Sequence, residues 1–458
     1  MNSVFANTGA GPSLVPVDID HAEYMAVVEP DTAFWSLIRK DRLADVLADP
    51  AFVQRVHDRG SDFAAEMNVL RFGLVPSAVY FNPTERCNLN CTYCYLPESI
   101  RRYGVHMSQS RMFEALEALL DFFHHSMPAG DRPQVIFHGS EPMLNRAAVF
   151  AAIDHFANDF VFGVQTNGTR LDSEAIEFLT SRQISLGLSL DGPLSQITDR
   201  TRHTYSGRGV HERVINVLEA LRGYPNHSVI CTVTTENLAH LTEIVELFHS
   251  LEVPTCMLNP VRCTLPGGQQ VRPSDADFAT AFIRALDRTY ELYQQTGRKL
   301  VVANFANVIM AVVAPTARRL MCDISPCGGG RSFFAVDAHG DLSPCSEFIG
   351  LPEFQGGNLF AGGLQTCFDT DAFRSVTCRT VEMIDPCRGC AIRHFCGAPC
   401  PAEAYGLHGD LAQRGAFCRF YEEQFRYAMR VIADGREDAY LWDNWNNATP
   451  TVFDVIIP

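Results

Sequence analysis

Apolar and polar positions follow two alternating patterns between residues 77 and 260. Short runs of β-branched and aromatic residues are followed by segments whose apolar residues recur every three or four positions, as Met112, Leu116 and Leu119 do. Six such steps follow one another, and the predicted strands are 77–82, 134–139, 160–166, 185–191, 228–234 and 255–260. Alternating strands and helices favour a parallel sheet with right-handed crossovers. Six units are too few for a closed eight-fold barrel, so we expect an α/β fold with a partial (β/α)6 barrel over residues 77–265.

The segments on either side of this barrel have weaker patterns. Residues 1–76 predict a small N-terminal cap made of a strand pair and a helix, and their first stretch lacks the basic region and apolar core of a secretory signal. Residues 266–320 predict a helical bridge, with one long helix near 274–296. Residues 321–425 are rich in Cys, Gly and Pro with little periodicity, so we expect them to need a metal for stability. The tail, residues 426–458, has no pattern that indicates a role.

The overall composition narrows the cellular setting. The 458 residues are 47% apolar and 20% charged, and no apolar run is long enough to cross a membrane. A formal net charge of −16 argues against broad contact with a phosphate backbone. We therefore expect a cytoplasmic protein without a membrane or nucleic-acid partner. In a reducing cytoplasm its sixteen cysteines are expected to be metal ligands rather than disulfides.

The sequence "CNLNCTYC" places Cys87, Cys91 and Cys94 directly after the first predicted strand of the barrel. In β/α folds the loops at the carboxyl ends of the strands carry the chemistry. Thiolate metal sites usually have four ligands, so three cysteines around a four-iron cluster would leave one iron without a protein ligand. An open coordination position is what a catalytic metal requires. A zinc site completed by a distant histidine is the alternative.

This loop resembles the CX3CXΦC motif of the radical S-adenosylmethionine (SAM) enzymes, in which Φ is aromatic. Cys87, Cys91, Tyr93 and Cys94 match the motif. The resemblance implies that the three cysteines hold a [4Fe–4S] cluster whose open iron is chelated by SAM. It also implies that reductive cleavage of SAM yields a 5′-deoxyadenosyl radical, which abstracts a hydrogen from the substrate.

Further motifs at the ends of the later strands extend the resemblance over roughly residues 76–260. "HGSEP" is similar to the family's GGEP motif, with Ser140 in place of the second glycine, and it implies that Glu141 binds the SAM amino group. "QTNGT", "SLDGP" and "DRTR" resemble the segments that contact the SAM ribose and carboxylate. They imply SAM contacts by Thr166, Asn167, Ser189 and Arg202. Taken alone, Glu141 could be a solvated loop acid and Arg202 a surface arginine.

A second group of cysteines lies between residues 322 and 418. Eight of them have the spacing expected of two four-ligand sets, which suits two fully ligated [4Fe–4S] clusters or, from spacing alone, two zinc sites. The array resembles the SPASM extension of radical SAM enzymes that modify peptides and proteins. By that resemblance auxiliary cluster I is held by Cys322, Cys327, Cys345 and Cys400, and auxiliary cluster II by Cys387, Cys390, Cys396 and Cys418. No role is assigned to Cys231, Cys256, Cys263, Cys367 and Cys378.

The residues after Cys345 bear on the reaction. In the sulfatase maturases of this family an Asp directly follows the equivalent cysteine and takes the substrate proton, whereas here Ser346 and then Glu347 follow. Serine is a poor base without a helper, so this departure weakens the sulfatase-maturase interpretation. The resemblance therefore implies a maturase of a ribosomally made precursor peptide, served by a reductant such as flavodoxin or ferredoxin. We expect it to install an intramolecular crosslink, with carbon–carbon closure favoured over a thioether, and residues 1–76 are candidates to hold the leader peptide. The alternatives are oxidation of Cys or Ser to formylglycine in a protein, and a metal-stabilised binding protein without turnover.

Overall fold

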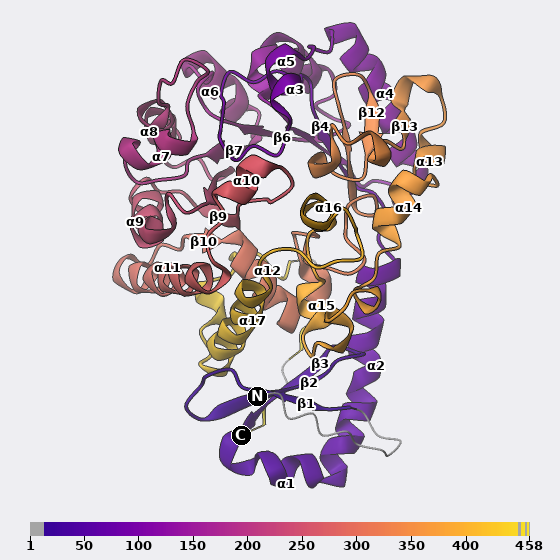
Figure 1. Cartoon of the computed structure of the whole chain (residues 1–458), viewed down its shortest axis with the longest axis vertical. Helices are drawn as coiled ribbons and strands as arrows, with labels where there is room; N and C mark the ends of the chain where they lie inside the picture. Colours follow the sequence, from indigo (N-terminus) through magenta and orange to yellow (C-terminus); the bar gives the residue numbers. More distant parts are fainter. Residues whose placement is uncertain (1–12, 448–449, 454–455, 458) are drawn as a thin grey trace.

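The structure is a computed structural model that describes residues 13–447, 450–453 and 456–457 (Figure 1). The first twelve residues, on which much of the expectation about a secretory signal depends, lie outside the described residues. In the part of the chain that is described, no helix is both long enough and apolar enough to cross a membrane.

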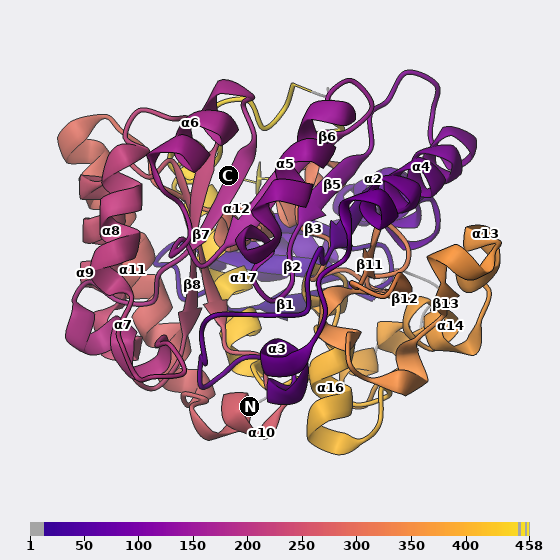
Figure 2. The ribbon, with the colours of Figure 1, turned by 90° about the horizontal axis from the view of Figure 1, so that it is seen from above.

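The centre of the molecule is the predicted open barrel. Six neighbouring strands run parallel in the order of the sequence. They are β4 (Ala78–Phe81), β5 (Gln134–Phe137), β6 (Val161–Thr166), β7 (Ser185–Ser189), β8 (His227–Val233) and β9 (Thr255–Pro260). The helices that connect them lie outside the strands (Figure 2). They are α3 (Glu98–Tyr103), α4 (Gln109–Ser126), α5 (Arg146–His155), α6 (Ser173–Ser181), α7 (Ser195–Thr201), α8 (His211–Ala220) and α9 (Leu241–Ser250). The expected partial (β/α)6 barrel is confirmed.

The sheet extends beyond the six predicted strands at both edges. Strand β10 (Val301–Val302) pairs in parallel with β9, and β11 (Phe333–Val336) pairs in parallel with β4. Two antiparallel strands, β12 (Asp341–Ser343) and β13 (Gly357–Asn358), follow β11. Strands β11 to β13 belong to the Cys-rich part of the chain. The pairing of β11 with β4 brings that part beside the first barrel strand, which the sequence pattern did not indicate.

Three long helices cover the β9 side of the barrel and pack on one another. They are α11 (Asp275–Thr296), α12 (Ala303–Val313) and α17 (Cys418–Ala433), and a short helix, α10 (Pro266–Gln270), precedes them. Helix α11 is the predicted long helix, and Ser274 begins it by accepting the Asp277 N–H at 3.1 Å. Phe278 of α11 stacks on Phe420 of α17 with ring centroids 4.0 Å apart. The bridge and the C-terminal helix therefore share one core.

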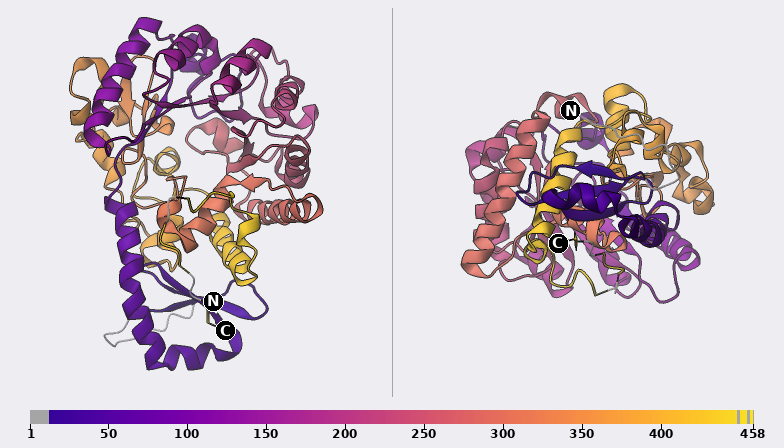
Figure 3. Two further views of the ribbon diagram at one scale, coloured as in Figure 1. Left: turned by 180° about the vertical axis from the view of Figure 1, so that it is seen from behind. Right: turned by 90° about the horizontal axis from the view of Figure 1, so that it is seen from below.

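The N-terminal region forms a small sheet at one end of the molecule (Figures 1 and 3). It contains β1 (Val15–Val17), β2 (Tyr24–Glu29) and β3 (Phe34–Arg39), and the C-terminal strand β14 (Ile456–Ile457) pairs in parallel with β3. After α1 (Leu43–Ala48), the long helix α2 (Pro50–Phe72) runs from this sheet towards the barrel (Figure 3). The predicted strand pair and helix are present, with two further strands that the sequence pattern did not indicate.

The Cys-rich part of the chain has only short elements after β13. They are α13 (Leu364–Cys367), α14 (Asp371–Thr377), α15 (Arg393–Cys396) and α16 (Pro401–His408), joined by loops and single 3-10 turns. Such a segment has little regular backbone pairing of its own. Three small buried clusters outside the main core include residues of this part. The clusters around Phe348 and Ile384 include predicted cysteine ligands, and the third contains Ala335, Ile349 and Leu96.

Candidate active site

The first cysteine loop follows β4 and faces a cavity of about 420 Å³. The thiols of Cys87, Cys91 and Cys94 all line this cavity. The backbone holds the loop in place, because the Cys87 N–H donates to the carbonyl of Arg101 in α3 at 2.8 Å and the Cys94 N–H donates to the Cys91 carbonyl at 3.3 Å. The loop therefore presents three sulfur atoms to one space.

The three thiols suit a metal cluster better than free acid–base chemistry. Burial raises the pKa of each, that of Cys94 to about 11, and negative charge on Cys91 raises the pKa of Cys87 further, so the sulfurs are close neighbours. Two donors already point at the Cys87 sulfur: the Leu89 N–H at 3.4 Å and the Asn167 side-chain amide at 3.9 Å. Such donors favour a thiolate, which is the form that binds iron. The donor set fits a [4Fe–4S] cluster with one iron left for another ligand.

Glu141 is a buried structural acid at the end of β5. It is 0% exposed, and its carboxylate accepts the Thr166 hydroxyl at 2.7 Å, the Asn167 N–H at 2.8 Å and the Met143 N–H at 3.0 Å. Burial raises the pKa of Glu141, and these hydrogen bonds oppose the rise. Thr166 and Asn167 line the cavity, whereas Glu141 lies behind them. The interpretation of Glu141 as a solvated loop acid is therefore wrong.

Arg202 is also buried, which excludes the surface-arginine interpretation. It follows α7, is 7% exposed, and lines the cavity together with Ser189 at the end of β7. Its Nη1 donates to the Tyr93 hydroxyl at 2.5 Å and lies 3.6 Å from Asp191 Oδ2, and the Tyr93 hydroxyl donates to the same carboxylate. Its Nε has no hydrogen-bond partner among the described residues. The positively charged Arg202 side chain thus lines the cavity beside the cysteine loop.

The other end of the same cavity is lined by four cysteines of the second group, Cys322, Cys327, Cys345 and Cys400. Burial raises the pKa of all four, that of Cys400 to about 12, and negative charge on Cys400 and Cys327 raises the pKa of Cys345, which shows that these thiols are neighbours. Cys322 has accessible surface, yet burial dominates its pKa because that surface belongs to the cavity. The structure brings the predicted ligands of auxiliary cluster I together.

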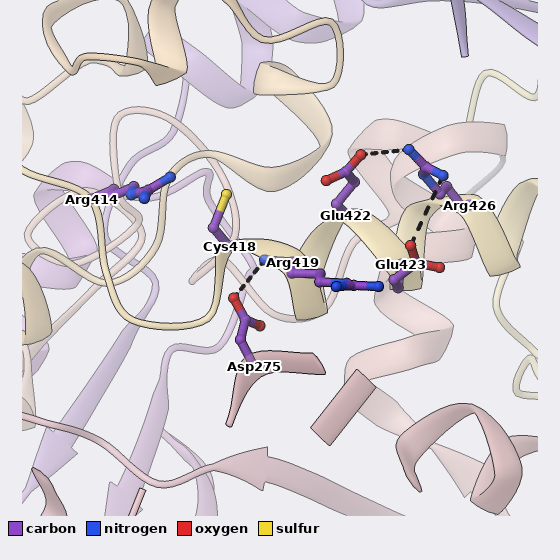
Figure 4. Close-up of a pocket in the computed structure, with 7 residues that line it drawn as sticks. All are labelled: Asp275, Arg414, Cys418, Arg419, Glu422, Glu423 and Arg426. Atoms are coloured by element: carbon purple, nitrogen blue, oxygen red, sulfur yellow. Dashed lines mark hydrogen bonds and ion pairs between the residues drawn. The ribbon is translucent and has the colours of Figure 1, made fainter. Parts of the chain in front are cut away.

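The remaining predicted ligands extend from the cavity to the outer surface. Cys396 lines the cavity; burial raises its pKa, and negative charges on Cys390, Cys418 and Cys387 raise it further. Cys418 begins α17 and lines a separate surface pocket of about 450 Å³ with several charged side chains (Figure 4). In that pocket Asp275 accepts two backbone N–H groups in the first turn of α17, at 2.8 and 2.7 Å. The predicted ligands of auxiliary cluster II therefore lie between the cavity, which Cys396 lines, and the outer surface, where Cys418 lies.

The space between the two cysteine sets contains polar groups that the motifs did not predict. Glu347 lines it with Oε2 unpartnered; burial raises the pKa of Glu347 to about 7, and the charge of Arg262 opposes this rise. The Tyr95 hydroxyl and His138 Nδ1 are also buried, with no partner in the part of the chain that the structure describes, and burial lowers the pKa of His138 to about 4. Unpaired buried polar atoms are costly, so this wall is suited to a polar ligand.

Four of the five unassigned cysteines lie in the core, and the fifth, Cys378, is exposed. Cys231 and Cys256 are fully buried in β8 and β9, as expected of core thiols. Among residues 13–447, 450–453 and 456–457, no group of three or more His, Cys, Asp or Glu side chains is placed to hold a single metal ion.

Comparison with known proteins gives a family for this arrangement. The profile of the radical SAM superfamily matches residues 81–248. An uncharacterized protein of Archaeoglobus fulgidus is 39% identical over 407 residues, which are 89% of this chain and 92% of that protein. The chain belongs to the radical SAM superfamily. Enzymes of this superfamily carry a [4Fe–4S] cluster, which agrees with the donor set of the cysteine loop.

More distant relatives extend the likeness to the second half of this radical SAM protein. The Cys-type anaerobic sulfatase-maturating enzyme of Clostridium perfringens is 23% identical over 367 residues, 75% of this chain and 93% of that enzyme. A solved structure of histidine-tagged anSMEcpe with bound AdoMet has a TM-score of 0.69 at 20% identity, covering 81% of this chain and 98% of that one. Streptococcus suis SuiB, solved with its precursor peptide SuiA, has a TM-score of 0.58 at 12% identity, covering 86% and 98%. The fold is therefore shared from the barrel into the Cys-rich region.

Proposed function

We propose that this radical SAM protein is a maturase of a ribosomally made precursor peptide. The observation that carries the proposal is the single cavity of about 420 Å³ whose two ends are lined by the two sets of thiols. We propose that the reacting residue of the substrate is held in this cavity. The similarity to a sulfatase-maturating enzyme and to a protein solved with a precursor peptide supports a peptide or protein as the substrate.

At the barrel end we assign Cys87, Cys91 and Cys94 to the [4Fe–4S] cluster that binds SAM. When bound, the cluster and SAM supply a carbon-centred radical that removes a hydrogen atom from a substrate carbon. Arg202 lines the cavity and contributes a buried positive charge, which suits the SAM carboxylate. The side chains proposed to contact SAM beside it are Tyr93, Thr166, Asn167 and Ser189. Glu141 holds the Thr166 hydroxyl and the Asn167 N–H in place by hydrogen bonds. We also propose that Glu141 contacts the SAM amino group.

At the other end we assign two fully ligated auxiliary [4Fe–4S] clusters, which gives three clusters in total. Cluster I takes the four thiols that line the cavity. Cluster II takes Cys387, Cys390, Cys396 and Cys418, which extend from the cavity to the surface. This placement supports transfer of an electron between the substrate and a carrier such as flavodoxin or ferredoxin. Full ligation leaves these irons without a position for substrate.

The proposed product is an intramolecular crosslink in the peptide, with a carbon–carbon bond favoured over a thioether. Closing the bond removes two hydrogens from the peptide. One leaves as a hydrogen atom, and the other leaves as a proton and an electron. The side chains of Tyr95, His138 and Glu347 line the cavity, and we propose that they contact the polar groups of the reacting residue.

Oxidation of a Cys or Ser to formylglycine is the second candidate, and one observation favours it. The carboxylate of Glu347 lies in the cavity, two residues after Cys345, with one oxygen unpartnered. A hydroxyl or thiol of a substrate can donate a hydrogen bond to that oxygen. Glu347 can therefore position such a side chain although Ser346 occupies the place where sulfatase maturases have an Asp.

The proposal is tested with anaerobically reconstituted protein. About twelve irons per chain and cleavage of SAM to 5′-deoxyadenosine under dithionite are expected for three four-iron clusters. Bound zinc without SAM cleavage would instead support a binding protein. Fragmentation mass spectrometry of a co-expressed peptide from a neighbouring short reading frame distinguishes the two products. A crosslink removes two hydrogens and blocks fragmentation between the joined residues, whereas formylglycine leaves an aldehyde at one residue.

A further inference from the structure

The carboxylate of Asp191 is buried behind the residues proposed to contact SAM, and the proposed function gives it no role. Asp191 lies two residues beyond β7 and is 1% exposed. Its Oδ1 accepts the Thr232 N–H at 2.9 Å, and its carbonyl accepts the side-chain amide of Asn237 at 2.7 Å. Its Oδ2 accepts the Tyr93 hydroxyl and lies 3.6 Å from Arg202 Nη1. Asp191 therefore joins the cysteine loop, the ends of β7 and β8, and the end of α7.

Asp191 itself does not reach the ligand space. Tyr93 and Arg202 line the cavity, whereas Asp191 lies behind them. Burying a carboxylate is unfavourable unless it is paired, and here Arg202 and the Tyr93 hydroxyl supply the pairing. The same contacts restrict the Arg202 guanidinium from one side. The guanidinium is thus held in one orientation where it lines the cavity.

We infer that Asp191 is a positioning residue for SAM, which holds the Tyr93 ring and the Arg202 guanidinium in the orientation that receives the SAM carboxylate. The inference rests on the proposed contact between Arg202 and SAM and not on the peptide chemistry. SAM affinity measured without peptide therefore tests it, and a failure of the peptide proposal would leave it intact.

The first experiment replaces the carboxylate by its amide. Asp191→Asn keeps the shape, removes the charge opposite Arg202, and turns one acceptor into a donor. In reconstituted holoprotein we expect SAM to bind about tenfold more weakly, with unchanged iron content, because a charged hydrogen-bond network is lost. The SAM-induced change in the electron paramagnetic resonance spectrum of the reduced cluster should require correspondingly more SAM.

Asp199→Asn is the matched control. Asp199 lies eight residues later, in α7, and its Oδ1 accepts the N–H groups of Val210 and His211 at 2.8 and 3.0 Å. Its carboxylate accepts backbone N–H groups as that of Asp191 does, but it does not line the cavity and has no hydrogen bond or ion pair with Arg202 among the described residues. We expect a lower melting temperature and SAM affinity within about twofold of wild type, since its hydrogen bonds stabilise only the turn.

A double substitution separates positioning from general stabilisation. If Asp191 acts through Arg202, Asp191→Asn should weaken SAM binding by less than about twofold in an Arg202→Met background, because coupled residues are not additive. The same loss in both backgrounds, or an unchanged affinity in Asp191→Asn alone, overturns the inference. Should Asp191→Asn fail to fold, Tyr93→Phe replaces it. We expect SAM binding about threefold weaker on loss of one hydroxyl, and an unchanged affinity overturns the inference equally.

Discussion

The two ends of the cavity are built in different ways. At the barrel end the ligand-facing residues follow strands of a ten-stranded sheet, and that sheet rests on a large apolar core. At the other end most of the thiols lie on loops and one-turn helices, and only Cys418 begins a longer helix, α17. Two small buried clusters, around Phe348 and Ile384, include four of the eight thiols. The difference indicates that the sheet positions its side chains without a metal. We expect the Cys-rich end instead to depend on a metal that joins its ligands.

The largest expected effect comes from the thiols of the barrel end. Changing Cys91 to Ala should abolish SAM cleavage while about eight irons remain bound, because the two auxiliary sites keep all their ligands. Iron analysis and detection of 5′-deoxyadenosine under dithionite measure both quantities. Cys378→Ser is the control, since Cys378 is exposed and belongs to neither set. Retained cleavage in Cys91→Ala would contradict the assignment of the open cluster.

Removal of the metal should have the next largest effect, and only at one end. After chelation under reducing conditions we expect protease cuts between residues 344 and 417, because that segment has only short elements of regular structure. The barrel, residues 77–260, should remain as a resistant fragment. Limited proteolysis followed by mass spectrometry of the fragments shows which occurs. Equal resistance of the apo and holo proteins would remove the contrast between the two ends.

The same contrast explains what could be predicted from the sequence. Strands β4 to β9 were predicted within about two residues because their apolar pattern is local. Strands β10 and β11 were missed because two to four residues carry too little pattern, and their pairing is decided by β9 and β4. The candidate ligands were found from spacing and motifs. Asp191 stood in a quoted motif, but its partner Tyr93 is 98 positions away, so only the fold reveals the contact.

A smaller effect is expected from Glu141, which lies behind the residues proposed to contact SAM. In Glu141→Gln the carboxamide can offer only one oxygen, so the Thr166 hydroxyl and the N–H groups of Asn167 and Met143 cannot all find an acceptor. We expect about tenfold weaker SAM binding, because the Asn167 backbone moves where it lines the cavity. Equilibrium dialysis with the reconstituted protein measures this. Thr166→Val removes only one donor and should cost less; a larger loss in that variant would show that the hydroxyl, rather than the carboxylate, is the important contact.

The smallest expected effect comes from removing one helix cap in the barrel and one in the Cys-rich part. Asp275 caps α17 at the Cys-rich end, and Asp172 caps α6 in the barrel by accepting the Ala175 N–H at 2.9 Å. Removing an N-cap costs about 1 kcal/mol, and the exposed ion pair of Asp172 with Arg146 adds little. Asp172→Ala should lower the melting temperature equally in holo and apo protein. Asp275→Ala should lower it mainly in the apo protein, since Cys418 at the start of α17 is then no longer tied to a cluster. Equal shifts in both states would show that the metal does not hold this helix terminus.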